Sequence, residues 1–376
     1  MVSAEPLFVA LSRFEGFRGV SPDALRASLP LWSIIQLKTE RILWRQGRPA
    51  DSLAIVHSGG LSVIVNGTVL DRVPAGEMVG EAAIFITGSQ RRASLSADEP
   101  TVVLSLSSGG LRQLRAQHSP LYAAILDHAL VVTLRRIHQL DRQIAQFRQG
   151  NFAAPPAREQ DHFLSRLWSR LRPPPEPDPA GCPPLDPLLA RQSALAGHPE
   201  ARAALASSFQ ARPFRRGESI ARQGDVDLRA FVLAAGNLDA LRTIEERGAA
   251  LLLARFEPGT IFGVQALIDG GPRAASIVAT TDGWLYHIDQ ATSRGLAPEV
   301  RTVWMEAMLA VLTAQCAAAS FTVQAALGAF ATRHDDAMPS MVIAPQLNSA
   351  LGSLEGLNPG DSSVELRVDR GSRRRR

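Results

Sequence analysis

The chain has few cysteines and lacks the features of a secretory leader. Only two of its 376 residues are cysteine, Cys182 and Cys316, and their separation matches no metal-binding or redox spacing. The first residues carry no basic segment and only a short apolar run, which is not the pattern of a signal sequence. Two unpaired thiols and no leader indicate a cytoplasmic protein.

The sequence also lacks the motifs that carry common enzyme chemistry. It contains no P-loop, no Cys/His metal spacing, no nucleophile elbow of the Gly-x-Ser-x-Gly type, and no Gly-x-Gly-x-x-Gly. Its eight histidines are scattered along the chain. We therefore expect a protein that is not an enzyme and needs no cofactor.

Excess positive charge is confined to one end of the chain. The formal net charge is +4, but the last seven residues, RGSRRRR, contain five arginines and no acid. Without them the net charge is −1, so the globular part is not basic overall. No specific nucleic-acid partner is expected, and the terminal run predicts only weak attraction to anionic partners.

One apolar stretch approaches the length of a membrane helix. Residues 307–330 read AMLAVLTAQCAAASFTVQAALGAF, in which alanine dominates and Gln315, Ser320 and Gln324 interrupt the run. Such a composition gives little insertion energy despite sufficient length. We expect a packed helix over 300–330 that can form a homodimer, and no membrane span.

What the chain does contain is an internal repeat. Residues 45–63 read RQGRPADSLAIVHSGGLSV, and residues 222–240 read RQGDVDLRAFVLAAGNLDA. Further landmarks pair in the same order, namely Gly59 with Gly236, Gly80 with Gly263, and Arg91 with Arg273. The offset grows from 177 at Gly59 to 183 at Gly80, which predicts a longer hairpin in the second copy.

Each copy has the same predicted order of elements. A helix over 21–32 opens the first, with Ser21 as N-cap and Pro22 at the first helical position. Short apolar runs broken by Gly, Asn-Gly and Pro-Ala-Gly follow, and long helices over 120–147 and 298–330 close the two copies. The predicted fold is mainly β with flanking α-helices, as two antiparallel β-barrels or jelly rolls in tandem.

The repeat also predicts the division into domains. A proline-rich stretch, RPPPEPDPAGCPPLDP, separates the copies and follows an amphipathic segment over 158–172, which we expect to dock on its own domain. After the second copy the sequence loses periodicity and gains Gly, Ser and Pro. The predicted units are a first domain over 1–147, a helix and linker over 148–190, a second domain over 191–330, and a disordered tail over 331–376.

The segment QRRASLS at 90–96 admits two interpretations. Two arginines before Ser94 are typical of a site for a kinase that prefers basic substrates, whereas an arginine could also hold the phosphate of a ligand. RRAS at 91–94 recurs as RAAS at 273–276, in register with the repeat. A modification site has no reason to be duplicated in register, so the recurrence favours a ligand pocket.

At these residues the chain resembles the cyclic-nucleotide-binding domain family. The phosphate-binding cassette of that family reads Phe/Ile-Gly-Glu, an apolar helical turn, and then Arg-x-Ala-Ser/Thr. The resemblance covers about 15–147 and 195–330. A chain with two copies resembles the regulatory subunits of cyclic-AMP-dependent protein kinases, and a single copy resembles the sensor half of catabolite-activator-type regulators.

The resemblance implies a binding site in the first copy, made of Gly80, Glu81, Ala82, Arg91, Arg92, Ala93 and Ser94. Gly80 permits a tight turn into a short helix whose first amides face outward. Glu81 can accept a hydrogen bond from a ribose hydroxyl, and Arg91 can hold the phosphate oxygens through charge-assisted bonds. Ala93 allows close approach, and Ser94 can add a hydroxyl.

The second copy departs from this pattern, because Val264 stands where Glu81 stands in the first. Its predicted site residues are Gly263, Val264, Arg273, Ala274, Ala275 and Ser276. Valine cannot accept a ribose hydroxyl, so the second site is expected to be weak, altered in ligand choice, or only structural. Family members that favour cyclic GMP often carry a hydroxyl residue in the cassette. Neither Arg92 nor Ala274 supplies one, which favours cyclic AMP.

The functional expectation is a non-catalytic receptor that transmits binding of cyclic AMP to a partner protein through the helix over 120–147. A DNA-binding regulator would need a helix-turn-helix, which neither 148–190 nor 331–376 contains recognisably. A kinase regulatory subunit resembling the family would carry an inhibitory segment and a dimerisation helix before the first domain. An interaction scaffold with two vestigial pockets is the remaining alternative.

Overall fold

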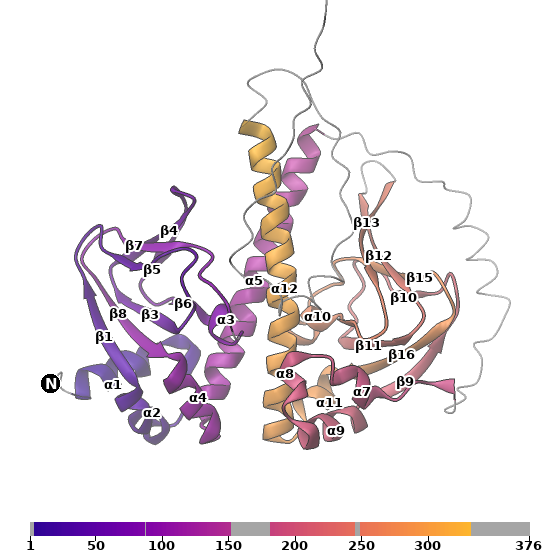
Figure 1. Cartoon of the computed structure of the whole chain (residues 1–376), viewed down its shortest axis with the longest axis horizontal. Helices are drawn as coiled ribbons and strands as arrows, with labels where there is room; N and C mark the ends of the chain where they lie inside the picture. Colours follow the sequence, from indigo (N-terminus) through magenta and orange to yellow (C-terminus); the bar gives the residue numbers. More distant parts are fainter. Residues whose placement is uncertain (1–3, 87, 152–180, 245–248, 332–376) are drawn as a thin grey trace, which may run out of the picture.

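The computed structural model describes residues 4–86, 88–151, 181–244 and 249–331. Two β-rich domains lie on either side of two long helices, α5 (Pro120–Asn151) and α12 (Pro298–Ala331), which stand side by side between them (Figure 1). The predicted helices over 120–147 and 298–330 are therefore confirmed.

In the first domain, helices precede the first strand and follow the last one, and one short helix lies between the sixth strand and the seventh. Its helices besides α5 are α1 (Ala4–Arg13), α2 (Pro22–Ser28), α3 (Glu81–Ile84) and α4 (Ser108–Ala116). Its strands are β1 (Trp32–Leu37), β2 (Ile42–Trp44), β3 (Ser52–Ser58), β4 (Gly60–Val65), β5 (Thr68–Pro74), β6 (Met78–Val79), β7 (Ser94–Ala97) and β8 (Thr101–Ser107). They form two antiparallel four-stranded sheets, in the orders β1-β8-β3-β6 and β2-β7-β4-β5.

The second domain repeats this arrangement. Its helices besides α12 are α7 (Leu185–Leu189), α8 (Ser193–Ala196), α9 (Pro199–Ser207), α10 (Val264–Asp269) and α11 (Gln290–Arg294). Its strands are β9 (Gln210–Phe214), β10 (Ser219–Ala221), β11 (Arg229–Ala235), β12 (Leu238–Ile244), β13 (Ala249–Phe256), β14 (Ile261–Phe262), β15 (Ser276–Ala279) and β16 (Gly283–Asp289). The sheet orders are β14-β11-β16-β9 and β10-β15-β12-β13, again antiparallel.

The predicted fold class is confirmed, with one refinement. Both domains are antiparallel β-sandwiches of the jelly-roll class with flanking helices, but among the described residues the two sheets of each domain do not close into a continuous barrel. The longer second hairpin is also confirmed. β12 and β13 together span 238–256, whereas β4 and β5 span 60–74.

Alternating side chains on the central strands connect each sandwich to the helices. On β3, Ala54 and Val56 pack inside the sandwich, while Leu53 and Ile55 pack against the helices. β11 shows the same alternation, with Phe231 and Leu233 inside the sandwich and its even-numbered neighbours facing the helices. Because both faces of these strands are covered, they are apolar almost throughout, which explains the uninterrupted runs in the sequence.

The opening helix is shorter than the sequence predicted. Ser21 caps α2 as expected, since its hydroxyl accepts a hydrogen bond from the Ala24 backbone N–H at 3.3 Å. The helix ends at Ser28 instead of Trp32, and a 3₁₀ turn over 29–31 follows. Pro30 explains the early end, because it lacks the backbone donor that a continuing helix needs. Trp32 instead begins β1.

The two domains share a hydrophobic core. Side chains from α1, α2, α4 and α5 join those of α7, α8, α9 and α12 in a single buried cluster, which includes Leu126, Leu130, Trp304 and Leu309. α5 and α12 begin at the same end of the molecule and run in the same direction (Figure 1). The domains are thus held by an extensive apolar interface as well as by the linker that connects them in sequence.

Among the helices that the structure describes, α12 is long and apolar enough to cross a membrane, judged by length and composition alone. Over Pro298–Ser320 its mean hydropathy is 1.3, and 56% of that stretch is buried inside the protein. Val303, Trp304 and Leu312 are fully buried. This burial is typical of a core helix, in agreement with the packed helix that the sequence predicted.

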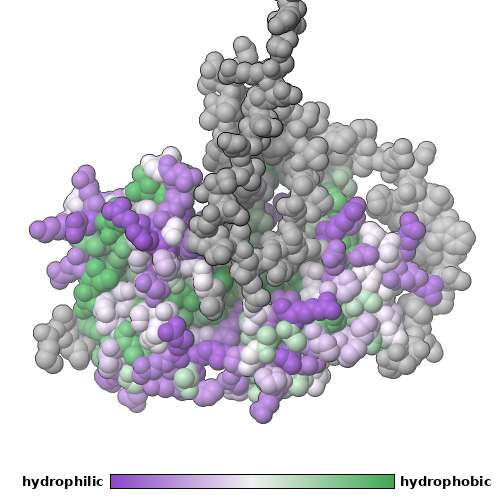
Figure 2. Space-filling view, viewed as in Figure 1, coloured by the Kyte–Doolittle hydropathy of each residue, from purple (hydrophilic) through white to green (hydrophobic). Residues whose placement is uncertain are grey.

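Where described side chains reach the surface, the lower rim of both domains is mainly polar (Figure 2).

Two predicted segments lie outside the described residues. They are the amphipathic segment over 158–172 and nearly all of the tail over 331–376. Within the predicted linker, α5 continues to Asn151, and α7 begins at Leu185. The division into domains otherwise remains a prediction.

Candidate functional site

The cassette of the first domain follows a sharp turn at the end of β6. Gly80 has a φ of 78°, in the left-handed region that favours glycine, and α3 begins at the next residue. The turn directs Glu81 into the domain, where it is 1% exposed. Arg91 returns to the same place from the segment before β7 and is 5% exposed. The structure therefore brings together the carboxylate and the guanidinium that the sequence singled out.

Glu81 is a buried carboxylate without a hydrogen-bond donor. Neither of its carboxylate oxygens has a hydrogen-bond partner among the described residues. The Arg136 guanidinium of α5 approaches to 3.9 Å, which is beyond hydrogen-bond distance. Burial raises the pKa of Glu81, and the charge of Arg136 opposes that effect. An unpaired buried carboxylate costs free energy that a donor from a bound ligand can recover.

Arg91 is anchored on one side and unpaired on the other. Its Nη2 donates to the Ser52 carbonyl at 2.7 Å and to the Ser52 hydroxyl at 3.0 Å, and lies 3.4 Å from Asp51 Oδ1. Its Nε and Nη1 have no hydrogen-bond partner among the described residues. Burial lowers the pKa of Arg91, and the charge of Asp51 opposes that effect. Two nitrogens of a fixed guanidinium, which carry three N–H groups between them, are thus available to an anion.

The residues that hold Arg91 in place come from parts of the sequence in which no site was predicted. Trp44 lies under the guanidinium, with 3.5 Å between the guanidinium carbon and the ring centroid. Asp51 and Ser52 lie at the start of β3, about forty positions before Arg91 in the sequence. Local motifs do not reveal such distant contacts. A weak signal was present, because Trp44 and Ser52 flank the repeated RQG triplet.

The repeated triplets and the cassettes are joined by the same hydrogen bonds in both domains. The Gln46 backbone N–H donates to Ser94 Oγ at 2.9 Å, and the Gly47 N–H donates to the Arg91 carbonyl at 2.8 Å. In the second domain, Gln223 N–H donates to Ser276 Oγ at 3.0 Å, and Gly224 N–H to the Arg273 carbonyl at 2.9 Å. Ser94 therefore has a structural role, while its own hydroxyl hydrogen remains available as a donor.

The other predicted residues of the first cassette differ in their surroundings. Ala82 lies in α3, and Ala93 precedes β7, and both are half-buried. Arg92 does not join Arg91 on its acceptors. Arg92 is exposed, although partial desolvation still lowers its pKa; Cys316 of α12 acts to raise that pKa and Arg136 of α5 to lower it. Arg92 therefore lies toward the long helices, away from the carbonyl and carboxylate that anchor Arg91.

Replacing Gly80 with alanine is expected to distort the cassette. A Cβ at this position would lie 2.6 Å from Arg91 Nη1 and 2.9 Å from the Trp44 ring, in a backbone conformation that disfavours side chains. We expect a loss of about 1–3 kcal/mol in the free energy of unfolding, measured by urea denaturation. Ligand affinity should fall about tenfold or more, because Arg91 must move.

Gly76→Ala provides the matched control for this substitution. Gly76 has a φ of 88°, and a Cβ there would meet no atom within 4 Å. The control therefore carries similar backbone strain without displacing Arg91. Equal losses of ligand affinity in the two variants would contradict the assigned role of Gly80.

The second cassette has the same backbone but different chemistry. Gly263 has a φ of 76° and precedes α10, whose first residue is the fully buried Val264. Arg273 donates to the Arg229 carbonyl at 2.7 Å and to the Gly263 carbonyl at 3.1 Å. It also forms an ion pair with Asp227 at 3.1 Å. Ala274 and Ala275 complete the segment that leads to Ser276 and β15.

The described part of the chain shows no cluster of three or more His, Cys, Asp or Glu side chains that could hold a metal ion. Cys182 and Cys316 are both unpaired thiols, and Cys316 is buried in α12.

Comparison with known proteins identifies both domains. The sequence model of the family described as Cyclic nucleotide-binding domain matches residues 34–118 and 211–297. These two stretches contain the paired sheets and both cassettes. Each domain of this chain therefore belongs to the cyclic nucleotide-binding domain family, and the chain carries two such domains in tandem.

Some of the individual relatives are named as a receptor or as regulatory subunits, and others, from Mycobacterium tuberculosis, are named as uncharacterized proteins. The cyclic AMP receptor protein of Thermus thermophilus is 38% identical over 76 residues, which are 20% of this chain and 35% of that protein. The regulatory subunit of cAMP-dependent protein kinase from Mycosarcoma maydis is 30% identical over 93 residues, which are 25% of this chain and 16% of that protein. The chain covers 16–35% of the length of the curated relatives that it matches.

A solved structure that matches this chain is the regulatory domain of Toxoplasma gondii PKA with cAMP. It is 17% identical, with a TM-score of 0.29, and the match covers 80% of this chain and 94% of the other.

Proposed function

We propose that this protein is a non-catalytic receptor for cyclic AMP, which binds in the first domain. The observation that supports the proposal is a set of buried, unpaired polar atoms in one cassette. These are both carboxylate oxygens of Glu81, and Nε and Nη1 of Arg91. A cyclic nucleotide offers a ribose hydroxyl as a donor and a phosphate with one negative charge as an acceptor. Its two polar groups therefore match the two unpaired groups of the site.

The position of the site suggests how binding affects the rest of the molecule. Glu81 lies 3.9 Å from the Arg136 guanidinium of α5, and α5 packs on α12 of the second domain. A ribose hydroxyl on Glu81 would compete with Arg136 for the carboxylate and alter the packing of α5. Couplings of this kind amount to about 1–3 kcal/mol.

We propose that a partner protein senses this change at the ends of α5 and α12. Both helices extend beyond the two domains (Figure 1). The homodimer predicted through 300–330 would have to use the same projecting end, since the beginning of α12 is buried against the rest of the protein. We propose that the protein acts in the cytoplasm.

Isothermal titration calorimetry of the full chain with cyclic AMP tests the proposal. Arg91→Ala should weaken binding by about 2–5 kcal/mol, because it removes one member of a buried charge pair. Arg72→Ala is the control, since Arg72 is an exposed arginine of the same domain that pairs with Asp98 and Glu99. Identical affinities in wild type and Arg91→Ala would refute the assignment.

Two further titrants sharpen the experiment. Cyclic GMP tests the predicted preference for cyclic AMP, and linear 5′-AMP tests the need for a phosphate with a single charge. A pull-down of partner proteins with and without cyclic AMP would then test transmission to an effector. A protein that binds no cyclic nucleotide at all would favour the scaffold with vestigial pockets.

A further inference from the structure

The stretch of α5 over 136–141 contacts both domains, between which the helix stands (Figure 1). Arg136 approaches Glu81 of the first cassette to 3.9 Å. Asp141 Oδ2 accepts a hydrogen bond at 3.2 Å from Nη2 of Arg242, which lies on β12 in the second domain. An α-helix turns the side chains of Arg136 and Asp141 about 140° away from each other, so that they face opposite domains.

Arg242 carries this contact on to the second cassette. Its Nε donates to the Ala274 carbonyl at 3.2 Å, and Ala274 directly follows the cassette arginine, Arg273. The side chains of Arg242 and Asp141 are only 22% and 29% exposed, so both are largely removed from water. Because one guanidinium bonds to a carboxylate and to a carbonyl at once, it connects α5 to the backbone of the cassette.

A second contact from α5 reaches the same cassette nearer to α10. His138 Nε2 lies 3.7 Å from Asp269 Oδ2 at the end of α10. Asp269 Oδ1 in turn accepts a hydrogen bond from the Gly271 backbone N–H at 2.8 Å, in the loop that leads to the cassette arginine. His138 and Asp141 are three positions apart and share one face of the helix, so α5 contacts the second cassette at two points.

The equivalent positions of the first domain cannot form this ion pair. β12 and β4 pair with the strands after the cassettes in the same register, which places Val65 of the first domain at the position of Arg242. On the long helices, Ala319 of α12 is at the position of Asp141, counted from the proline that begins each helix. Neither valine nor alanine carries a charge, so these positions hold only the second cassette from the neighbouring domain.

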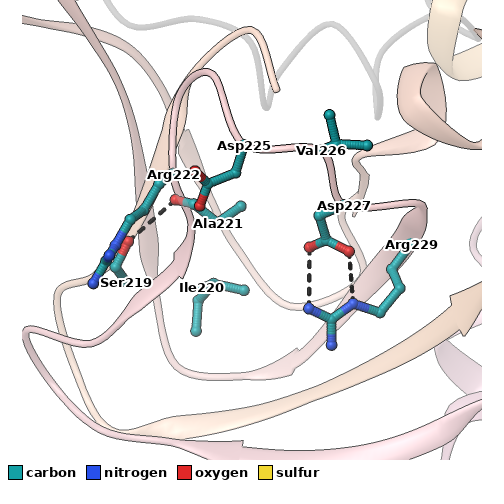
Figure 3. A pocket seen from close by; sticks show the side chains of 8 residues that line it. All are labelled: Ser219, Ile220, Ala221, Arg222, Asp225, Val226, Asp227 and Arg229. Atoms are coloured by element: carbon teal, nitrogen blue, oxygen red, sulfur yellow. Dashed lines mark hydrogen bonds and ion pairs between the residues drawn. The ribbon is translucent and has the colours of Figure 1, made fainter. Parts of the chain in front are cut away.

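The loop that holds the second cassette from its other side borders open space. The Gly224 N–H donates to the Arg273 carbonyl at 2.9 Å, and the Arg273 N–H donates to the Asp225 carbonyl at 2.9 Å. A cavity of about 530 Å³ opens beside Asp225 and Val226 of this loop (Figure 3). Because the loop can move into the cavity together with the cassette, it fixes the cassette less firmly than a contact with the packed helix does.

We propose that Asp141 is a positioning residue, which holds the second cassette through Arg242, and that cyclic AMP bound in the first domain releases this hold. The inference rests on the proposed function of the first domain, where a ribose hydroxyl displaces Arg136 from Glu81. The helix that carries Arg136 also carries Asp141, so a shift or rotation of α5 lengthens the bond to Arg242. The state of the first pocket then determines the mobility of the second cassette.

Hydrogen exchange in the ligand-free full chain, measured by mass spectrometry over 270–276, tests the positioning role. Asp141→Ala should speed exchange in this segment about three- to tenfold, because the segment loses its connection to α5. Asp127→Ala is the matched control and should leave this exchange unchanged. It removes another ion pair between α5 and the second domain, with Arg301 at 3.8 Å, about 21 Å from Asp141 along the helix. Equal exchange in wild type and Asp141→Ala would overturn the inference.

Arg242→Ala shows whether Asp141 acts through Arg242. This variant should speed exchange over 270–276 as much as Asp141→Ala does, and the double variant should speed it no further. Additive effects of the two substitutions would contradict the connection through Arg242. Should Asp141→Ala prevent folding, Asp141→Asn keeps the shape of the side chain and removes its charge, and it should produce the same faster exchange.

Cyclic AMP provides the test of release. At saturation it should speed exchange over 270–276 in wild type, whereas a ligand bound in the second pocket itself would slow it. Asp141→Ala should show no further increase, because its cassette is already released. By linkage, Asp141→Ala should bind cyclic AMP about three- to fivefold more tightly than wild type, and Asp127→Ala should match wild type within about twofold. Structural damage alone would not raise the affinity of a distant site.

These outcomes separate the inference from the proposed function. If calorimetry shows no binding of cyclic AMP, the proposed function is wrong, while exchange in the ligand-free variants still tests the role of Asp141. If cyclic AMP binds with an affinity that depends on Arg91, but exchange over 270–276 slows or stays the same, the proposed function stands and release by the ligand is refuted.

Discussion

Replacing Glu306 with alanine should lower the free energy of unfolding by about 3–5 kcal/mol, because it breaks a largely buried ion pair between the domains. Glu306 of α12 accepts hydrogen bonds from Arg115 Nε and Nη2 at 2.7 and 2.9 Å and from the Tyr122 hydroxyl. Its side chain is 12% exposed. The substitution removes the carboxylate that accepts from the Arg115 guanidinium and the Tyr122 hydroxyl, and Arg115 Nη2 keeps only its contact with His198 Nε2 at 2.9 Å.

Urea denaturation followed by tryptophan fluorescence would measure the effect. The transition should keep a single step, since the shared apolar core still joins the domains after the Glu306 contact is lost. The control is Asp127→Ala, which removes the exposed pair between Asp127 and Arg301 at 3.8 Å in the same interface and should cost at most about 1 kcal/mol. Equal losses in the two variants would show that Glu306 has no special role.

The second large effect is expected from Glu81→Gln, which should change ligand affinity and stability in opposite directions. Cyclic AMP affinity should fall about ten- to a hundredfold, because an amide is a poorer acceptor for the ribose hydroxyl than a carboxylate. The ligand-free protein should become more stable by about 1–3 kcal/mol at neutral pH, since the variant no longer buries an unpaired charge.

The gain in stability should depend on pH in a defined direction. Folding raises the pKa of Glu81 above its ordinary value of 4.5, so the folded protein binds this proton more tightly than the unfolded chain. Wild type therefore loses stability as pH rises above that value, and Glu81→Gln does not. Thermal melts should show a small difference near pH 4 and a larger one near pH 7.

Glu77→Gln is the matched control for these melts. Glu77 is an exposed carboxylate four positions before Glu81, and its charge contributes to the raised pKa of Glu81. Removing an exposed carboxylate should leave affinity nearly unchanged and alter stability only slightly. If Glu77→Gln reproduced the stabilisation of Glu81→Gln, burial of the unpaired charge would not be its cause.

The repeat and the fold class could be predicted because their signals are local and occur twice. The triplet RQG and the cassette arginine recur in order, and each has a structural reason in the hydrogen bonds from Gln46 and Gly47 to the first cassette. The alternation of buried residues on β3 and β11 likewise follows from their positions between sandwich and helices. Agreement among such local signals makes a fold predictable.

The partners of the cassette could not be predicted in this way. Trp44, Asp51 and Arg136 meet Arg91 or Glu81 only after folding, across about forty to fifty-five positions of sequence. The contact between Arg115 and Glu306 joins residues 191 positions apart. Hydrophobic periodicity indicates which faces are buried, but it does not indicate which polar groups meet there.

Asp227 shows the same limit within the repeat itself. Alignment of the RQG triplets places Asp227 opposite Ala50, whereas the functional counterpart on the arginine is Asp51. A shift of one position changes which side chain can reach the guanidinium. Only the three-dimensional arrangement reveals that a carboxylate from a different position performs a related role.

The parallel pairing of α5 and α12 has a consequence for how the two halves can evolve. Identical subunits that meet through like helices must carry every substitution twice, so a change that suits one binding site is imposed on its twin. Here the two halves are encoded separately on one polypeptide. A substitution in one half, such as Val264 where the first domain has Glu81, therefore leaves the chemistry of the other half unchanged.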